Sequence, residues 1–140
     1  MQRLPVRPSR SLRSWFLCGI SGGLALLLWL AGGVLVAQAT DRCVDPTGAG
    51  GCYTTIQDAV SVAASGDTII IAAGTYKDGT VSVSRKNLSF VGAGTDQTFV
   101  DGNHTSSVFI TSSGAQIELS NLTVQNGYSA ASNGAGIYAI

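Results

Sequence analysis

Charged side chains are scarce in this chain of 140 residues, because Asp, Glu, Lys and Arg together make up 11% of it. Four of the eight basic residues lie in the first thirteen positions, where there is no acid, so the remainder sets four basic residues against eight acids. A net-negative region without a Lys/Arg cluster cannot neutralise a run of phosphates, which excludes a nucleic-acid-binding protein. The mean hydropathy of +0.29 excludes a solvated, disordered chain.

Residues typical of catalysis are equally scarce. His104 is the one histidine, and the residues around it, which include Ser106 and Ser107, form nothing like a nucleophile elbow. Within residues 102–140 the only formally charged residue is Glu118, and a single carboxylate cannot supply both an acid and a base. The sequence therefore predicts no catalytic residue, and the chain as given is not expected to be an enzyme.

The first 39 residues have the three parts of a secretory signal peptide. Four arginines precede an uncharged stretch, residues 15–36, which ends in the small-x-small site Ala37-Gln38-Ala39. We expect cleavage between Ala39 and Thr40. The alternative is a retained membrane anchor, because 22 helical residues at about 1.5 Å each span about 33 Å, enough to cross a bilayer. In both interpretations the remainder is exported, and only this segment contacts a membrane.

Export determines how the two cysteines beyond the leader are interpreted. Cys43 and Cys52 flank a turn-rich loop that contains Asp-Pro and three glycines, so residues 40–52 form a lead-in loop whose ends can meet. In an oxidising compartment such a pair is typical of a disulfide, which stabilises the fold by about 2–3 kcal/mol in the chain-entropy model. A metal site is the alternative, but two thiols supply only half of a tetrahedral shell.

Residues 53–140 begin with one helix and continue as short strands. Thr54 and Gln57 match a capping box and Gly66 matches a helix end, and the apolar residues between them share one helical face: Ile56, Ala59, Val60 and Ala63. Beyond Gly66 the apolar period changes from 3.6 to 2. Apolar pulses, each a predicted strand, occur at residues 68–71, 81–83, 88–91, 98–100, 108–110, 117–119, 122–124 and 137–138.

The mean spacing of these pulses, about ten residues, fits a β-sandwich, a barrel or a β-solenoid. Three features favour the solenoid. The strands are very short, asparagine and glycine recur at the corners, and the phrase beginning at Asn87-Leu88 recurs loosely at Asn121-Leu122, 34 residues later. Fewer than three coils of three strands are expected, and after Tyr138 nothing is expected to cover the last strands, so the chain is predicted to be an incomplete, self-associating solenoid.

Three phrases together resemble the start of the pectin-lyase-like right-handed parallel β-helix proteins. They are Thr55-Ile56-Gln57-Asp58-Ala59-Val60, then Gly66-Asp67-Thr68-Ile69-Ile70-Ile71-Ala72-Ala73-Gly74-Thr75-Tyr76, then Asn87-Leu88-Ser89-Phe90-Val91-Gly92-Ala93-Gly94. The resemblance implies an all-β parallel β-helix in which a short helix covers the exposed strand edges at the N-terminal end. It is specific for the fold and weak for the activity, because one fold serves many functions.

Two classes of function follow from the resemblance. Residues 74–78 are similar to a pectinesterase signature but end in Asp78 rather than glutamate, and the glutamine of the catalytic-region signature is absent near Gly134. The glycine-rich phrase at residues 134–138 looks more like adhesin and polymorphic outer-membrane β-helices. We therefore expect an adhesin-like or carbohydrate-binding scaffold, secreted or at the cell surface, with polysaccharide or glycan partners. The alternative is the N-terminal part of a polysaccharide lyase or pectinase-type enzyme whose catalytic coils lie beyond residue 140.

No cofactor is expected, although two weaker signals remain. Asp96 and Asp101, with Asn103 nearby, can be calcium ligands, but they are also typical of turns around a strand. Tyrosines 76, 128 and 138 can stack on sugars if they share one exposed face, which the sequence does not show.

Overall fold

The computed structural model describes residues 38–130 and 134–140. The fold described below is that of the unit Ala37–Ile140, within these described residues. The predicted leader, whether signal peptide or anchor helix, lies outside the described residues. Among the helices of the described ranges, none is both long and apolar enough to cross a membrane.

The described residues are mostly strand, with few helices, which confirms the all-β class. A short 3-10 turn, η1 (Ala49–Gly51), and one α-helix, α2 (Ile56–Val62), accompany the strands. The strands are β1 (Asp41–Val44), β2 (Thr68–Ile71), β3 (Gly74–Tyr76), β4 (Val81–Ser84), β5 (Asn87–Gly92), β6 (Thr98–Asp101), β7 (Phe109–Ser112), β8 (Gln116–Ser120), β9 (Thr123–Gln125) and β10 (Ile137–Ala139).

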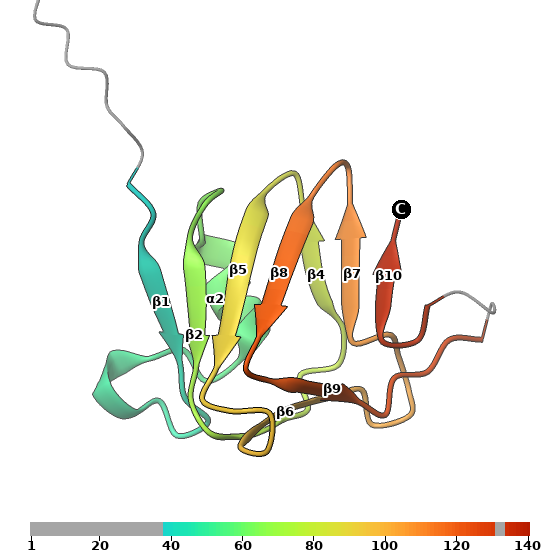
Figure 1. Ribbon diagram of the computed structural model, residues 1–140, viewed down its shortest axis with the longest axis horizontal. Helices are drawn as coiled ribbons and strands as arrows, with labels where there is room; N and C mark the ends of the chain where they lie inside the picture. Colours follow the sequence, from blue (N-terminus) through green and yellow to red (C-terminus); the bar gives the residue numbers. More distant parts are fainter. Residues whose placement is uncertain (1–37, 131–133) are drawn as a thin grey trace, which may run out of the picture. The chain divides into compact units, whose positions relative to one another are not determined.

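These strands form three sheets in which every pairing is parallel. The four-stranded sheet has the order β1-β2-β5-β8, and the two three-stranded sheets have the orders β3-β6-β9 and β4-β7-β10. From β2 onward, consecutive strands belong to different sheets, and each strand from β5 to β10 pairs with the one three places earlier in the chain, whereas β1 pairs with the next strand, β2. Figure 1 shows the four-stranded sheet in front of β4, β7 and β10, with β6 and β9 below them.

The phrase at residues 87–92 recurs loosely in the sequence at residues 121–127, but the two phrases do not occupy equivalent positions in the structure. Asn87 pairs with Gln116 in the four-stranded sheet, whereas Thr123 pairs with Phe99 in another sheet. The two similar phrases therefore occupy different sheets. The two asparagines also differ in conformation, because Asn121 has positive φ whereas Asn87 is the first residue of β5 and does not.

The structure also contains two strands that the apolar pulses do not predict. β1 lies within the lead-in segment, expected to be a loop, and pairs with β2 along its whole length. β3 is the Gly-Thr-Tyr phrase, which shows only one buried side chain, Tyr76. Both strands have too few apolar residues to alternate visibly, so their strand conformation comes from pairing with a neighbour.

The core lies between the inward faces of the sheets. Side chains alternate along β5, so Leu88 and Phe90 are buried while Asn87 is exposed. Phe90 meets Phe109 of β7 edge-to-face, with ring centroids 5.3 Å apart, and this pair joins the four-stranded sheet to the β4-β7-β10 sheet. Gly92 continues the inward row, where a Cβ atom would lie 2.2 Å from the carbonyl oxygen of Asn121, so only glycine fits there.

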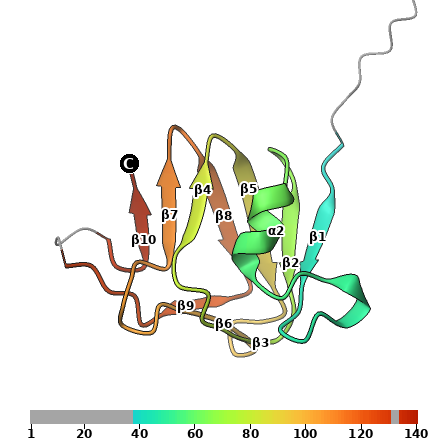
Figure 2. The same ribbon diagram turned by 180° about the vertical axis from the view of Figure 1, so that it is seen from behind.

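Helix α2 packs over the edge of the sheets with the apolar face that the sequence predicts. Ile56, Ala59, Val60 and Ala63 are all buried, and Figure 2 shows the helix beside β2 and β4. Its cap differs from the prediction, because Thr55 rather than Thr54 is the N-cap and accepts a hydrogen bond from the Asp58 backbone N–H. The Gln57 side chain, predicted to complete the capping box, instead accepts a hydrogen bond from the Ser82 N–H of β4 at 2.8 Å.

Side chains from the connections on either side of β4 hold both ends of α2. At the N-terminus, the Ile56 backbone N–H donates to Asp78 Oδ2 at 2.6 Å. At the C-terminus, Lys86 Nζ donates to the carbonyl oxygens of Val60 at 2.9 Å and Ala63 at 2.8 Å. An acid at the start and a base at the end of a helix both complement its dipole. The helix of seven residues is too short to be stable alone, so these contacts and its buried face fix it.

We predict that Lys86→Met lowers the free energy of unfolding by about 1–2 kcal/mol, because the last helical carbonyls lose a charged donor while the aliphatic stem is retained. Chemical denaturation followed by circular dichroism measures the change. The matched control is Lys77→Met, which removes the charge of an exposed lysine and is expected to change the stability by less than about 0.5 kcal/mol. Equal effects of the two substitutions would contradict this role of Lys86.

Candidate functional site

The outer face of the four-stranded sheet presents its polar side chains in rows, because strands paired in parallel register stack equivalent positions. One row consists of Asp41, Thr68, Ser89 and Glu118, one residue from each strand. The neighbouring row, which contains Ile69 and Phe90, points into the core, and both of these side chains are fully buried. The outer row is exposed or half-buried, so it forms a flat ladder of hydroxyl and carboxylate groups.

A hollow of about 220 Å³ lies at the β5–β8 side of this outer face. It is lined by Asn87, Leu88 and Ser89 from β5, by Gln116, Ile117 and Glu118 from β8, and by Gly66, so apolar surface from Leu88 and Ile117 accompanies the four polar side chains. Ser89 Oγ donates to Glu118 Oε2 at 3.4 Å, and the Gln116 N–H donates to Asn87 Oδ1 at 3.2 Å. Since it is smaller than the roughly 300–1,000 Å³ of pockets for drug-sized ligands, the hollow suits one small polar unit.

Asp67 lies elsewhere, at the start of β2, and holds the lead-in segment to the sheet. Its side chain is 2% exposed. It accepts hydrogen bonds from the Ala64 N–H at 3.0 Å, the Thr40 N–H at 2.9 Å and Arg42 Nε at 3.3 Å. These donors, with the Ala64 and Thr40 backbone groups as the larger causes, hold the pKa of Asp67 below its usual range. Its charge is therefore used to join β1, β2 and the end of the helix.

Tyr76 and Asp78, which belong to the pectinesterase-like phrase, also have structural contacts. The Tyr76 hydroxyl donates to the carbonyl oxygens of Ala72 at 3.0 Å and Val44 at 3.4 Å. Burial, together with the charges of Asp45 and Asp78, raises the pKa of Tyr76 to about 12. Burial likewise raises the pKa of Asp78, whose carboxylate binds the N-terminus of α2.

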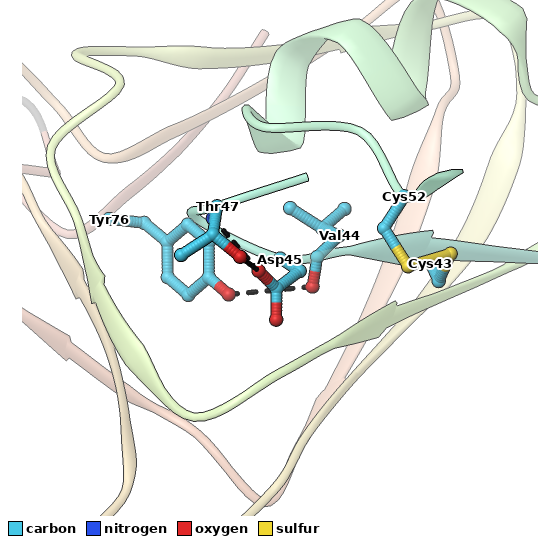
Figure 3. The surroundings of a disulfide bond; sticks show 6 residues. All are labelled: Cys43, Val44, Asp45, Thr47, Cys52 and Tyr76. Atoms are coloured by element: carbon cyan, nitrogen blue, oxygen red, sulfur yellow. Dashed lines mark hydrogen bonds between the residues drawn. A yellow bond between two sulfur atoms is a disulfide. The ribbon is translucent and has the colours of Figure 1, made fainter. Parts of the chain in front are cut away.

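The structure joins Cys43 to Cys52, the pair that the sequence analysis selects, with their Cα atoms 4.9 Å apart. Figure 3 shows this disulfide near Val44 and Asp45, at the edge of the four-stranded sheet. Tyr53 follows the disulfide and forms a parallel bridge with Val44, in which the Tyr53 N–H donates to Cys43 O at 3.0 Å. The disulfide and the bridge together close the lead-in loop against the outer edge of β1.

Asp96 and Asp101, the residues considered as calcium ligands, differ in their burial. Asp96 is exposed in the β5–β6 loop, whereas Asp101 is 6% exposed at the end of β6. The Asp101 carboxylate accepts from the Asn103 N–H at 2.8 Å, Gln125 Nε2 at 3.1 Å and Asn126 Nδ2 at 3.0 Å. These donors, the Asn103 N–H above all, lower the pKa of Asp101. Within residues 38–130 and 134–140, no three His, Cys, Asp or Glu residues group as metal ligands.

The remaining sequence candidates do not form a common site. Tyr76 is buried in the core, so it does not share an exposed face with Tyr128, which is 51% exposed, or with half-buried Tyr138. His104 is exposed at a turn with positive φ, where its backbone N–H donates to Asn126 O. At the predicted cleavage site, Ala39 and Thr40 are both exposed.

The sequence analysis does not single out the hollow on the four-stranded sheet. Its four polar residues occupy alternate positions of two strands, and this alternation is visible in the sequence as Asn87-x-Ser89 and Gln116-x-Glu118. Their proximity depends on the register between β5 and β8, which the alternation alone does not define.

Comparison with known proteins finds no matching family model, no matching curated protein and no matching solved structure.

We predict that Asp67→Asn destabilises the protein at neutral pH and removes part of its acid sensitivity. Because the folded-state pKa of Asp67 is lowered, its contribution is present above the unfolded-state pKa of about 3.9 and is lost as the pH falls through the folded-state value. Thermal midpoints measured from pH 7 to pH 2 test this. The wild type should lose more stability below pH 4 than Asp67→Asn does, while Asp96→Asn, at an exposed loop position, should follow the wild type. Identical profiles for Asp67→Asn and the wild type would contradict the assignment.

Proposed function

We propose that residues 53–140 are the cap helix and first coils of a right-handed parallel β-helix of the pectin-lyase-like type. Two observations support this proposal. All strand pairings are parallel, and from β2 to β10 the strands occur in a fixed rotation among three sheets, which is the order a coiled chain produces. The α2 side chain of Gln57 accepts from the β4 edge, the position where the resemblance implies a covering helix.

We further propose that the protein is exported, either secreted or held at the cell surface, with residues 1–39 as a cleaved signal peptide. The basic start, the apolar stretch and the Ala37-Gln38-Ala39 site support this, as does the disulfide, which is typical of oxidising compartments. Retention by residues 15–36 as a membrane anchor is the alternative.

At this location the protein acts as a non-catalytic scaffold, adhesin-like or carbohydrate-binding, whose partner is a polysaccharide or a cell-surface glycan. The observation that carries this proposal is the polar hollow on the four-stranded sheet. Hydroxyl, amide and carboxylate groups in one small concavity match the hydrogen-bonding groups of a sugar unit. By contrast, Asp67, Asp78 and Asp101 bind donors of the chain itself, so their charges serve the fold.

The second candidate is the N-terminal part of a polysaccharide lyase or pectinase-type enzyme with catalytic coils beyond residue 140. The phrase from Gly66 to Tyr76, which resembles the opening of that superfamily, favours it. The two candidates differ in one measurable respect, because the scaffold retains a polymer whereas the enzyme changes it.

The test is to incubate the protein exported from its complete gene, with any coils beyond residue 140, with neutral polysaccharides and with pectin and polygalacturonate, measuring retention on the polymer and release of reducing ends or unsaturated products. We expect retention of at least one polymer without any product. Replacing Asn87 by Ala should weaken that retention about 3- to 10-fold, because one or two hydrogen bonds are lost. The control is Asn103→Ala, at an exposed loop position outside the hollow.

Product formation from any of these polymers would instead support the enzyme. If no polymer is retained, or if Asn87→Ala and Asn103→Ala have equal effects, the hollow is not the binding site and the proposal is wrong.

A further inference from the structure

Thr40, the residue after the predicted cleavage site, is held on both sides of its backbone. Its carbonyl oxygen accepts from the Thr68 N–H at 3.2 Å, which continues the β1–β2 ladder by one residue. Its own N–H donates to Asp67 Oδ1 at 2.9 Å. The nitrogen of Thr40 is thus fixed against a carboxylate that is itself 2% exposed. Ala39 and Gln38, the two residues before it, are exposed and open to a peptidase.

We propose that removal of the leader after Ala39 places a new α-ammonium group on Asp67, so that processing locks the mature N-terminus into the fold. This inference rests on the proposed export and cleavage. A membrane peptidase hydrolyses the Ala39–Thr40 peptide bond with one water molecule. The C–N bond breaks, the water oxygen joins the Ala39 carbonyl carbon to give a carboxylate, and the Thr40 nitrogen leaves as an amine that is protonated at neutral pH.

Cleavage changes the charge of the Thr40 nitrogen that contacts Asp67, while both partners keep their positions. Before cleavage, Thr40 contributes one neutral amide N–H, and Arg42 Nε supplies the cationic partner of Asp67 at 3.3 Å. After cleavage, the same nitrogen carries a positive charge, so a hydrogen bond whose acceptor is already ionised becomes an ion pair. The other two N–H groups of the ammonium reach solvent, because Thr40 is exposed.

The charges around this contact favour a second cation. Asp67 accepts from Arg42 of β1, and Asp41 follows Thr40 in the sequence, so the contact and the next residue of the chain include two acids and one base. Lys86, the nearby cation at the end of α2, donates its hydrogen bonds to Val60 and Ala63 instead. An added ammonium therefore balances the local charge, and it ties the start of the mature chain to the residue that also binds the Ala64 N–H after the helix.

The experiment compares the wild-type gene with a variant that has one glycine inserted between Ala39 and Thr40, both exported through their own leader. The new N-terminus is confirmed by mass spectrometry. In the insertion variant the α-amino group lies one residue further out, and Asp67 again meets a neutral amide at Thr40. The reaction of the α-amino group with an amine-acylating reagent at pH 7.5 is followed, together with the thermal midpoint. Each protein is also labelled in denaturant as its own reference.

We expect the folded wild-type α-amino group to react about 2- to 8-fold more slowly than in the insertion variant, because the Asp67 carboxylate favours its protonated, unreactive form. The two proteins should react alike in denaturant. The thermal midpoint of the insertion variant should be lower by about 2–5 °C. In an Asp67→Asn background both differences should disappear.

Equal reactivity of the two folded proteins, with both cleaved after Ala39, would overturn the ion pair and leave the proposed export intact. A wild-type product that still begins at Met1 would overturn the cleavage and the ion pair together. Because the comparison of folded and denatured wild type needs no substitution, the inference is decided even if Asp67→Asn does not fold.

Discussion

Parallel pairing throughout the three sheets is the constraint on which the rest of this structure depends. Strands that stack in one direction leave an edge where no earlier strand exists, and unpaired backbone groups at such an edge cost free energy or recruit other chains. The chain covers two of these edges by different means. Gln57 of α2 accepts from Ser82 on the β4 edge, and Tyr53 bridges to Val44 beside the disulfide on the β1 edge.

Several charged side chains hold the covering elements in place. Asp78 and Lys86 hold the two ends of α2, and Asp67 joins the lead-in strand to the end of the helix region. With so few charges in the chain, their use in the fold leaves the outer face of the four-stranded sheet to neutral polar groups with Asp41 and Glu118. A face of this kind can bind through many weak hydrogen bonds, which is why we infer recognition rather than chemistry.

The local elements could be predicted from the sequence, whereas the pairing of distant ones could not. The spacing of Ile56, Ala59, Val60 and Ala63 defines a helical face whatever lies against it, and all four are buried. Register has no such local signal. Thr68 pairs with Ser89, and Ser89 with Glu118, across connections of unequal length, so the repeat in space leaves no constant period in the sequence. The hollow depends on this register, and therefore only the structure shows it.

Amide hydrogen exchange of Ser82 measures whether α2 covers the β4 edge. The Ser82 N–H donates to a side chain of α2, so its exchange reports whether the helix stays in place. We expect the Ser82 amide to exchange slowly in the wild type and at least about tenfold faster in Gln57→Ala, which corresponds to a loss of about 1.4 kcal/mol of protection. The amide of Ser89, which donates to Asp67 O within the sheet, should keep its rate. Fast exchange of the Ser82 amide in the wild type would show that α2 does not cover the β4 edge.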